Sequence, residues 1–290
     1  MPKLSDTLPE IQAEFAEAAA DPIAANAAVQ AALDAATPWP EAELPPDDLV
    51  NLPGGLLVKG EVIRTAIVQE LTGVHEEALA RATQSQNPFH FVNTLLDCGT
   101  VQFGDENKSR TKELLKQALV GDRDAIILGI RRATYGDVID LKEWECPECG
   151  NKSDLSIPIT SIPVTYLEKP QEETVFEVSL RKGKSARVRL VNGADQTAIF
   201  EDPKLNPKQM DSIMLSRCVL AIRDADGTEH NLAGQPNLAR NLSIPDRHAI
   251  IKELANRQPG PNFNDVKFVH DDCGKEVTLL LGIGDLFLDF

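Results

Sequence analysis

Two short motifs hold the residues whose types and spacing indicate chemistry. In "ECPECG" two residues separate Cys146 from Cys149, in "VHDDCG" two residues separate His270 from Cys273, and a glycine follows each pair. Thiolate and imidazole are preferred zinc ligands, and the glycine allows backbone N–H groups to face the sulfur of the second ligand. The two turns, which we call knuckles, therefore predict one zinc ion in a closed Cys3His site. Such a site is structural rather than catalytic, because it leaves no position for water.

The two ligand pairs are separated by 120 residues (150–269). The entropic cost of closing a loop grows only logarithmically with its length, so a zinc ribbon tolerates a long insertion. We expect residues 150–269 to form an α/β subdomain whose ends are held together at the metal. The alternative is that the pairs are unrelated and that His270 is an ordinary residue at a strand edge.

The composition limits the classes of function. The chain has 290 residues, of which 42% are hydrophobic and 26% charged, as expected for a globular protein. Its formal charge of −16 disfavours direct contact with nucleic acid. No apolar run approaches the roughly 20 residues of a membrane helix, and the first residues lack the pattern of a secretory signal. We therefore expect synthesis in a reducing cytoplasm, where five cysteines favour metal ligation or burial over disulfides.

Residues 1–48 differ from the rest of the chain. Residues 8–36 are rich in Ala and Glu, and 37–48 contain four prolines without periodicity. Residues 1–50 carry ten acidic side chains against one basic one, Lys3. We interpret 1–48 as an acidic arm and linker that orders on a partner or attaches loosely as a helix. A mobile acidic tail is the alternative.

The elements of the body follow from periodicity and capping residues. Alternation over 57–71 predicts a strand pair, and Asn87 before a proline predicts a helix that ends at Gly99. A helix over 108–119 and a second one capped by Asp122 predict a helical hairpin.

Strand signals dominate after Gly136. Two hairpins are expected around Gly183 and Gly227, and a helix is expected after Ser243. The fold class is therefore α+β. A helical hairpin region in 49–140 precedes a strand-rich zinc-ribbon region in 141–290, with the large insertion between its two knuckles.

Other motifs are weaker. "HEEAL" resembles a metalloprotease helix, but Leu79 stands where a second histidine is required. "RDADGTEHNLA" resembles a calcium loop, but Asp224 and Asp226 are explained by turn chemistry. Cys98 and Cys218 lie in apolar runs, which favours burial over reactivity. No nucleophile and base stand out together, so we do not expect an enzyme.

The order of several motifs resembles one known family. "QELTGVHEEALARA", "ALVGDRDAIILGIRRATYGD", "CPECG", "IPDRHAIIKEL" and "HDDCGK" follow one another as in the bacteriophage baseplate proteins typified by the T4 baseplate hub subunit. The resemblance covers roughly Leu52 to Phe290 and leaves the arm outside. His270 stands where the family pattern usually offers a cysteine, which an imidazole can replace as a zinc ligand.

The resemblance implies a structural or assembly role in a phage tail baseplate. It implies other baseplate, hub or tube proteins as partners, a location in the virion tail after assembly in the host cytoplasm, and compatibility with a homo-oligomer inside a symmetric baseplate. Candidate contact surfaces are the C-terminal "LFLDF", which could instead complete the core, the exposed side of "AIILGIRRATYG", and the acidic arm. The main alternative is a zinc-ribbon adaptor that binds proteins in transcription or another intracellular complex, and a metal-dependent enzyme is the third.

Overall fold

The computed structural model describes residues 48–85, 87, 89–232 and 240–287. Every described residue belongs to one compact unit, Pro45–Phe290. The predicted arm, 1–48, lies outside the described residues except for Asp48. The remainder mixes helices with several small antiparallel sheets, which confirms the α+β class.

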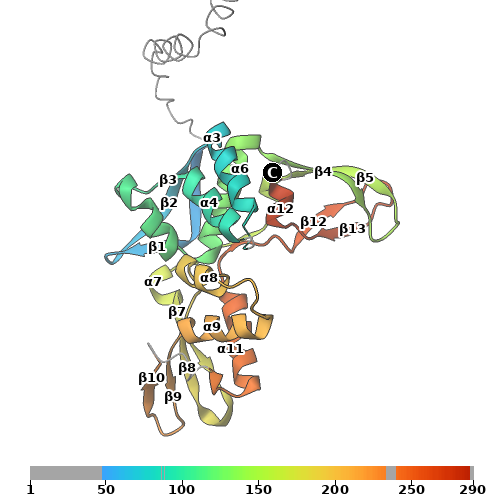
Figure 1. Cartoon of the computed structure of the whole chain (residues 1–290). Helices are drawn as coiled ribbons and strands as arrows, with labels where there is room; N and C mark the ends of the chain where they lie inside the picture. Colours follow the sequence, from blue (N-terminus) through green and yellow to red (C-terminus); the bar gives the residue numbers. More distant parts are fainter. Residues whose placement is uncertain (1–47, 86, 88, 233–239, 288–290) are drawn as a thin grey trace, which may run out of the picture. The chain divides into compact units, whose positions relative to one another are not determined.

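A three-stranded antiparallel sheet opens the described chain (Figure 1). Its strands are β1 (Leu49–Val58), β2 (Glu61–Val68) and β3 (Thr100–Phe103), and between β2 and β3 lie the helices α3 (Gly73–Thr83) and α4 (Phe89–Gly99). Lys59 and Gly60, both with positive φ, make the turn between β1 and β2. The predicted strand pair and the helix that ends at Gly99 are confirmed, although the first strand begins earlier than expected.

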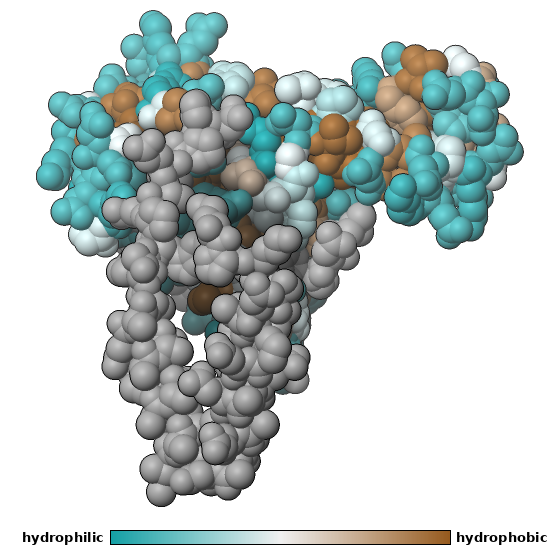
Figure 2. Space-filling model, turned by 90° about the horizontal axis from the view of Figure 1, so that it is seen from above, coloured by the Kyte–Doolittle hydropathy of each residue, from teal (hydrophilic) through white to brown (hydrophobic). Residues whose placement is uncertain are grey.

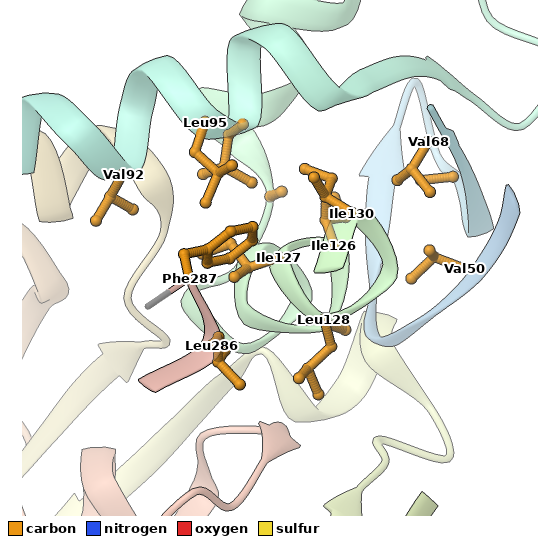
Figure 3. Close-up of a cluster of buried hydrophobic side chains, with 14 of the residues drawn as sticks. Val50, Val68, Val92, Leu95, Ile126, Ile127, Leu128, Ile130, Leu286 and Phe287 are labelled. Atoms are coloured by element: carbon orange, nitrogen blue, oxygen red, sulfur yellow. The ribbon is translucent and has the colours of Figure 1, made fainter. Parts of the chain in front are cut away.

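Helix α6 (Val120–Tyr135) is the centre of the larger core. Figure 3 shows its isoleucines between Val50 and Val68 on the sheet, Leu95 of α4 and Phe287 near the C-terminus. All residues from 125 to 131 are buried. The expectation that an exposed side of "AIILGIRRATYG" forms a contact surface is therefore wrong for 125–131, which are buried in the core, whereas Tyr135 near its end is 39% exposed.

The predicted helical hairpin does not form as expected. The first segment is a short 3-10 turn, Lys108–Arg110, followed by α5 (Thr111–Gln117). The second helix starts at Val120 with Leu119 as its N-cap, so Asp122 lies inside the first turn. Helix α6 packs mainly on β1 and α5 mainly on β3 and α8, so the two helices do not pair along their lengths.

Two hairpins form the ribbon that carries both knuckles. One consists of β4 (Val138–Glu145) and β5 (Lys152–Pro158), and the other of β12 (Val266–Val269) and β13 (Glu276–Leu279). The chain then forms α12 (Ile283–Leu286), in which Leu286 is 1% exposed, while the adjacent Phe287 is 3% exposed. These two residues of "LFLDF" belong to the core, and 288–290 lie outside the described residues.

The segment between the ribbon hairpins has its own apolar cluster. Its larger elements are α8 (Gly193–Ile199), α9 (Pro207–Cys218), α11 (Ile244–Arg257) and a four-stranded antiparallel sheet of β7 (Val175–Ser179), β8 (Ser185–Arg189), β9 (Val219–Arg223) and β10 (Glu229–Asn231). The smaller ones are a 3-10 turn (Ile159–Ser161), β6 (Val164–Thr165), α7 (Pro170–Glu173), a second 3-10 turn (Arg181–Gly183) and β11 (Gly260–Pro261). Both predicted hairpins and the helix after Ser243 are confirmed, whereas α8 and α9 were not predicted.

The entry and exit of this segment lie side by side. β6 near its start pairs with β11 near its end. At the exit, Gly121 of α6 approaches the backbone so closely that a Cβ there would lie 1.6 Å from the carbonyl oxygen of Pro259. The ends of the long segment are thus tied together by backbone contacts as well as by the ribbon.

Candidate metal centre

The four predicted ligands converge at the tip of the ribbon. Their ligand atoms, one from each of Cys146, Cys149, His270 and Cys273, all lie within 4.8 Å of one another. Nδ1 of His270 is 3.7 Å from Sγ of Cys149 and 3.4 Å from Sγ of Cys273. In a tetrahedron with Zn–S of about 2.3 Å and Zn–N of about 2.0–2.1 Å, adjacent S and N atoms lie about 3.5 Å apart. The donor set and its spacing therefore fit a tetrahedral zinc ion.

The two knuckles repeat the same backbone hydrogen bonds. In the first, N–H of Cys146 donates to O of Asn151 (2.9 Å) and N–H of Gly150 donates to O of Cys146 (2.8 Å). In the second, N–H of His270 donates to O of Lys275 (2.9 Å) and N–H of Gly274 donates to O of His270 (2.7 Å). The glycines have φ of 74° and 65°, a conformation that residues with a Cβ rarely adopt. Two distant segments thus build equivalent turns.

Backbone N–H groups face the sulfurs of the first knuckle. Desolvation opposes ionisation of Cys146, but N–H groups of Glu148 and Cys149 and the neighbouring thiols outweigh it and lower its pKa. A hydrogen bond from N–H of Asn151 lowers the pKa of Cys149. Burial and the thiols of Cys146 and Cys273 outweigh it, so the pKa of Cys149 is raised overall. Because crowded thiols cannot all ionise without a cation among them, this cluster suits a metal ion.

His270 is held by groups that the sequence did not indicate. Its side chain is 2% exposed, its Nδ1 faces the sulfurs, and its Nε2 lies 3.1 Å from the hydroxyl of Ser153. The ring of Trp144 packs edge-on against it, with ring centroids 5.8 Å apart, and also against Phe268 at 5.3 Å. A hydrogen bond from Nε2–H to Ser153 leaves the Nδ1 lone pair available for a metal, which is the usual arrangement around a ligating histidine.

Polar side chains also join the two knuckles. Nζ of Lys275 lies 2.7 Å from Glu148, and Nδ2 of Asn151 donates to Asp272 at 3.4 Å. All four side chains belong to exposed residues, so these contacts add little stability. These polar contacts therefore contribute little to holding the two knuckles together.

The other candidate residues have structural explanations. His75 accepts a hydrogen bond from N–H of Thr72 at the start of α3. N–H of Gly227 donates to the backbone oxygen of Asp224 (2.9 Å) and N–H of Thr228 donates to the carboxylate of Asp226 (2.9 Å), which confirms turn chemistry. Cys218 is fully buried, and burial raises the pKa of its thiol to about 12, whereas Cys98 is only half-buried. Within the described residues, no second group of three or more His, Cys, Asp or Glu side chains converges as the ribbon cluster does.

Comparison with known proteins identifies the family. The family model for the T4 bacteriophage base plate protein matches residues 68–288, which include both hairpins of the ribbon and all four candidate ligands. The chain belongs to the T4 bacteriophage base plate protein family. No curated protein and no solved structure matches it. In the described part of the chain, no helix has the length and apolar character to cross a bilayer.

Membership confirms the resemblance seen in the sequence motifs. It implies a structural component of a phage baseplate, a location in the virion tail and association with other phage proteins. It also favours a non-enzymatic role, in agreement with the sequence prediction.

Proposed function

We propose that this protein is a structural or assembly component of a phage tail baseplate hub that binds other baseplate, hub or tube proteins through a zinc-stabilised ribbon. The observation that carries the proposal is the convergence of two matched knuckles in a chain of the baseplate family. One structural zinc ion per chain would be held by Cys146, Cys149, His270 and Cys273. A closed four-ligand set supplies no reactive position, so the role of the site is to hold the fold.

The small size of the ribbon hairpins supports a structural metal. β12 and β13 have four residues each, and each hairpin is a two-stranded sheet. An isolated two-stranded hairpin is at best marginally stable in water. Four ligands drawn equally from the two hairpins would therefore fix each hairpin against the other.

The organisation of the chain fits this role. We propose three parts: the acidic arm 1–48, the region 49–140 around α6, and the ribbon domain 141–290 with its inserted α/β subdomain. Two separate apolar clusters support the distinction between the ribbon side and the insertion. The formal charge of −16 supports protein partners rather than direct contact with nucleic acid.

The assignment is tested by metal analysis and by particle assembly. Protein purified without chelators should contain one zinc per chain. Wild-type protein added to lysates that lack only this protein should be incorporated into tail particles. Cys149→Ser should lose both zinc and incorporation, whereas Cys98→Ser, outside the cluster, should keep both. Zinc-free wild-type protein that enters particles at the normal level would refute the role of the metal. Wild-type protein that never enters particles would refute the baseplate role.

A further inference from the structure

A groove runs between the two hairpins of the ribbon. It has a volume of about 490 Å³ and is lined by residues 153–158 and 161 on one side and 267–272 on the other. The first run is nearly all of β5, and the second covers the end of β12 and the start of its knuckle. Figure 1 shows both hairpins extending away from α6, and Figure 2 shows hydrophobic residues exposed among hydrophilic ones at this end of the unit.

One edge of β5 pairs with no other strand of the described residues. At the two ends of its pairing with β4, N–H of Cys146 donates to O of Asn151 and N–H of Ile159 donates to O of Asp137. The irregularity between these bonds lies on β4, so odd-numbered residues of β5 face β4 throughout. The N–H and C=O groups of Asp154 and Ser156 therefore point away from β4.

The free edge of β12 follows from the same reasoning. His270 is hydrogen-bonded to Lys275 across the hairpin, and the register of β12 and β13 is continuous. The backbone groups of Lys267 and Val269 therefore point away from β13. Within the described residues, neither β5 nor β12 pairs with a third strand. Both free edges belong to residues that line the groove.

The side chains in the groove indicate what could occupy it. Leu155 and Ile157 of β5 and Phe268 of β12 contribute to the core cluster and give the groove an apolar floor. Its ionisable lining side chains are three aspartates and one lysine besides His270, namely Asp154, Asp271, Asp272 and Lys267. Asp154 already pairs with Lys142 at 2.9 Å and Lys267 lies 3.8 Å from Asp265, so the negative charge that faces an occupant comes mainly from Asp271 and Asp272. An occupant with an alternating apolar side and basic flanking residues would match this lining.

We propose that the groove binds an extended segment of a partner protein, which adds an antiparallel strand to the edge of β5. Its backbone would pair with Asp154 and Ser156, its apolar side chains would meet the groove floor, and its basic residues would face the aspartates. Strand addition to a free sheet edge is an established mode of protein recognition. The inference deepens the assembly role and rests on it, but purified protein is sufficient for its test.

The inference is tested by Ser156→Pro, and β5 itself already contains a proline at an equivalent position. Pro158, which has no N–H, already occupies an outward position of β5. Ser156→Pro should therefore leave the pairing with β4 intact while removing the outward donor. Ser156 also donates to Asp140 through its hydroxyl, so Ser156→Ala is the matched control for loss of that bond.

The probe is a synthetic octapeptide, Lys-Thr-Val-Thr-Val-Thr-Val-Lys, added to the zinc-loaded full chain. Amide exchange measured by NMR should show fast exchange of the amides of Asp154 and Ser156 in the free protein and slower exchange with peptide. Ser156→Ala should keep the affinity, and Ser156→Pro or a peptide N-methylated at alternate residues should weaken it by about tenfold or more, the effect of losing one or more hydrogen bonds. Glu in place of both Lys residues should weaken it by about threefold for each unfavourable cross-strand charge pair.

Three outcomes would overturn the inference. The first is the absence of protection with the octapeptide, and the second is equal binding by wild-type protein and a folded, zinc-loaded Ser156→Pro variant. The third is concentration-dependent protection of Asp154 and Ser156 without peptide, which would assign the groove to a second copy of this chain. None of these outcomes depends on tail particles, so failure here is distinguishable from failure of the baseplate role.

Discussion

The core around α6 and the ribbon differ in how much apolar surface they bury. In α6, seven consecutive residues (125–131) are buried, and they meet apolar side chains from β1, β2, α4 and the end of the chain. In the ribbon, β12 and β13 together bury only Val266, Val277 and Leu279, and the tip consists of polar knuckles around four candidate ligands. Burial alone can order the first region, whereas the tip of the second would depend on coordination by the proposed zinc ion.

The difference predicts that the two regions respond differently to perturbation. A change at a ligand should disorder the ribbon and spare α6. A change at α6 should lower the free energy of unfolding of the whole unit and leave the zinc content unchanged. The following predictions test this separation, beginning with the largest expected effect.

Loss of one ligand should have the largest effect. Structural zinc contributes on the order of 10 kcal/mol in small zinc domains, so Cys149→Ser should disorder both ribbon hairpins. Trp144, which packs against His270, reports this through its fluorescence once Trp39, the other tryptophan, is replaced by Phe. Amide exchange on α6 should stay slow. The separation of the regions would be wrong if α6 and the ribbon lost protection together, and Cys98→Ser should change neither.

A methyl group at the close approach on α6 should have the next largest effect. In Gly121→Ala, the new Cβ would meet backbone atoms of Pro259 and Gly260, which cannot rotate away. Overpacking of this kind costs about 1–3 kcal/mol, and backbone contact favours the upper end. Thermal or denaturant unfolding should show the loss, with zinc content unchanged.

The matched control for that substitution is Gly73→Ala. Gly73 starts α3, and nothing lies within 4 Å of the position of its Cβ. Alanine is favoured over glycine in a helix by up to about 1 kcal/mol, so this variant should be as stable as the wild type or slightly more stable. Equal destabilisation by both substitutions would contradict the importance of the contact with Pro259.

Two carboxyl groups at the start of α6 should make the stability of the core depend on pH. Desolvation raises the pKa of Asp122 to about 6, although N–H groups of Gly54 and Gly55 oppose the change. Desolvation also raises the pKa of Asp124 to about 7, opposed by Arg123 and assisted by Asp122. Both values exceed the ordinary value of 3.8. The folded state therefore binds these protons more tightly than the unfolded state does.

The sign follows from that difference. The stabilisation is fully present below pH about 4 and is lost as pH rises through about 6–7. We expect the free energy of unfolding to fall by on the order of 1–3 kcal/mol between pH 4.5 and 7.5. Asp122→Asn keeps an oxygen for N–H of Gly54, which donates to Asp122 at 2.6 Å, and should flatten the profile. The free energy of unfolding of that variant can be measured in urea at each pH. If it changes with pH as steeply as that of the wild type, Asp122 is excluded as the source of the pH dependence.

Local signals predicted the two knuckle turns and the convergence of the four candidate ligands. The spacing of Cys146 and Cys149 and the glycine after them are properties of one short segment, and the matching pair repeats them. Helix α9 was missed although Asn206 before Pro207 is the same start signal as Asn87 before its proline. That error lies in the interpretation, because the signal was present.

Other features depended on contacts between distant segments. Asp122 was taken as a helix cap because its type and position suit one, but the fold uses it to bind the backbone of Gly54. Ser153 gave no signal, since its role arises only when β5 brings it to the ring of His270. Burial on nearly every side of α6 was likewise hidden, because it depends on how the sheet, α4 and the C-terminus surround that helix.

Ser153→Ala should have the smallest effect and the most local one. The variant keeps all four ligands and removes only the hydroxyl 3.1 Å from Nε2 of His270. Loss of such a supporting hydrogen bond typically weakens metal binding by about 10–100-fold. Since the cluster is closed and Trp144 still packs against the imidazole, we expect a value near tenfold. Competition with a chromophoric zinc chelator measures it, and Ser161→Ala, which removes a hydroxyl bonded to Pro158, is the control. Affinity unchanged from wild type would show that packing against Trp144 alone orients His270. A loss as large as that of Cys149→Ser would show that the ribbon cannot tolerate even a change outside its ligands.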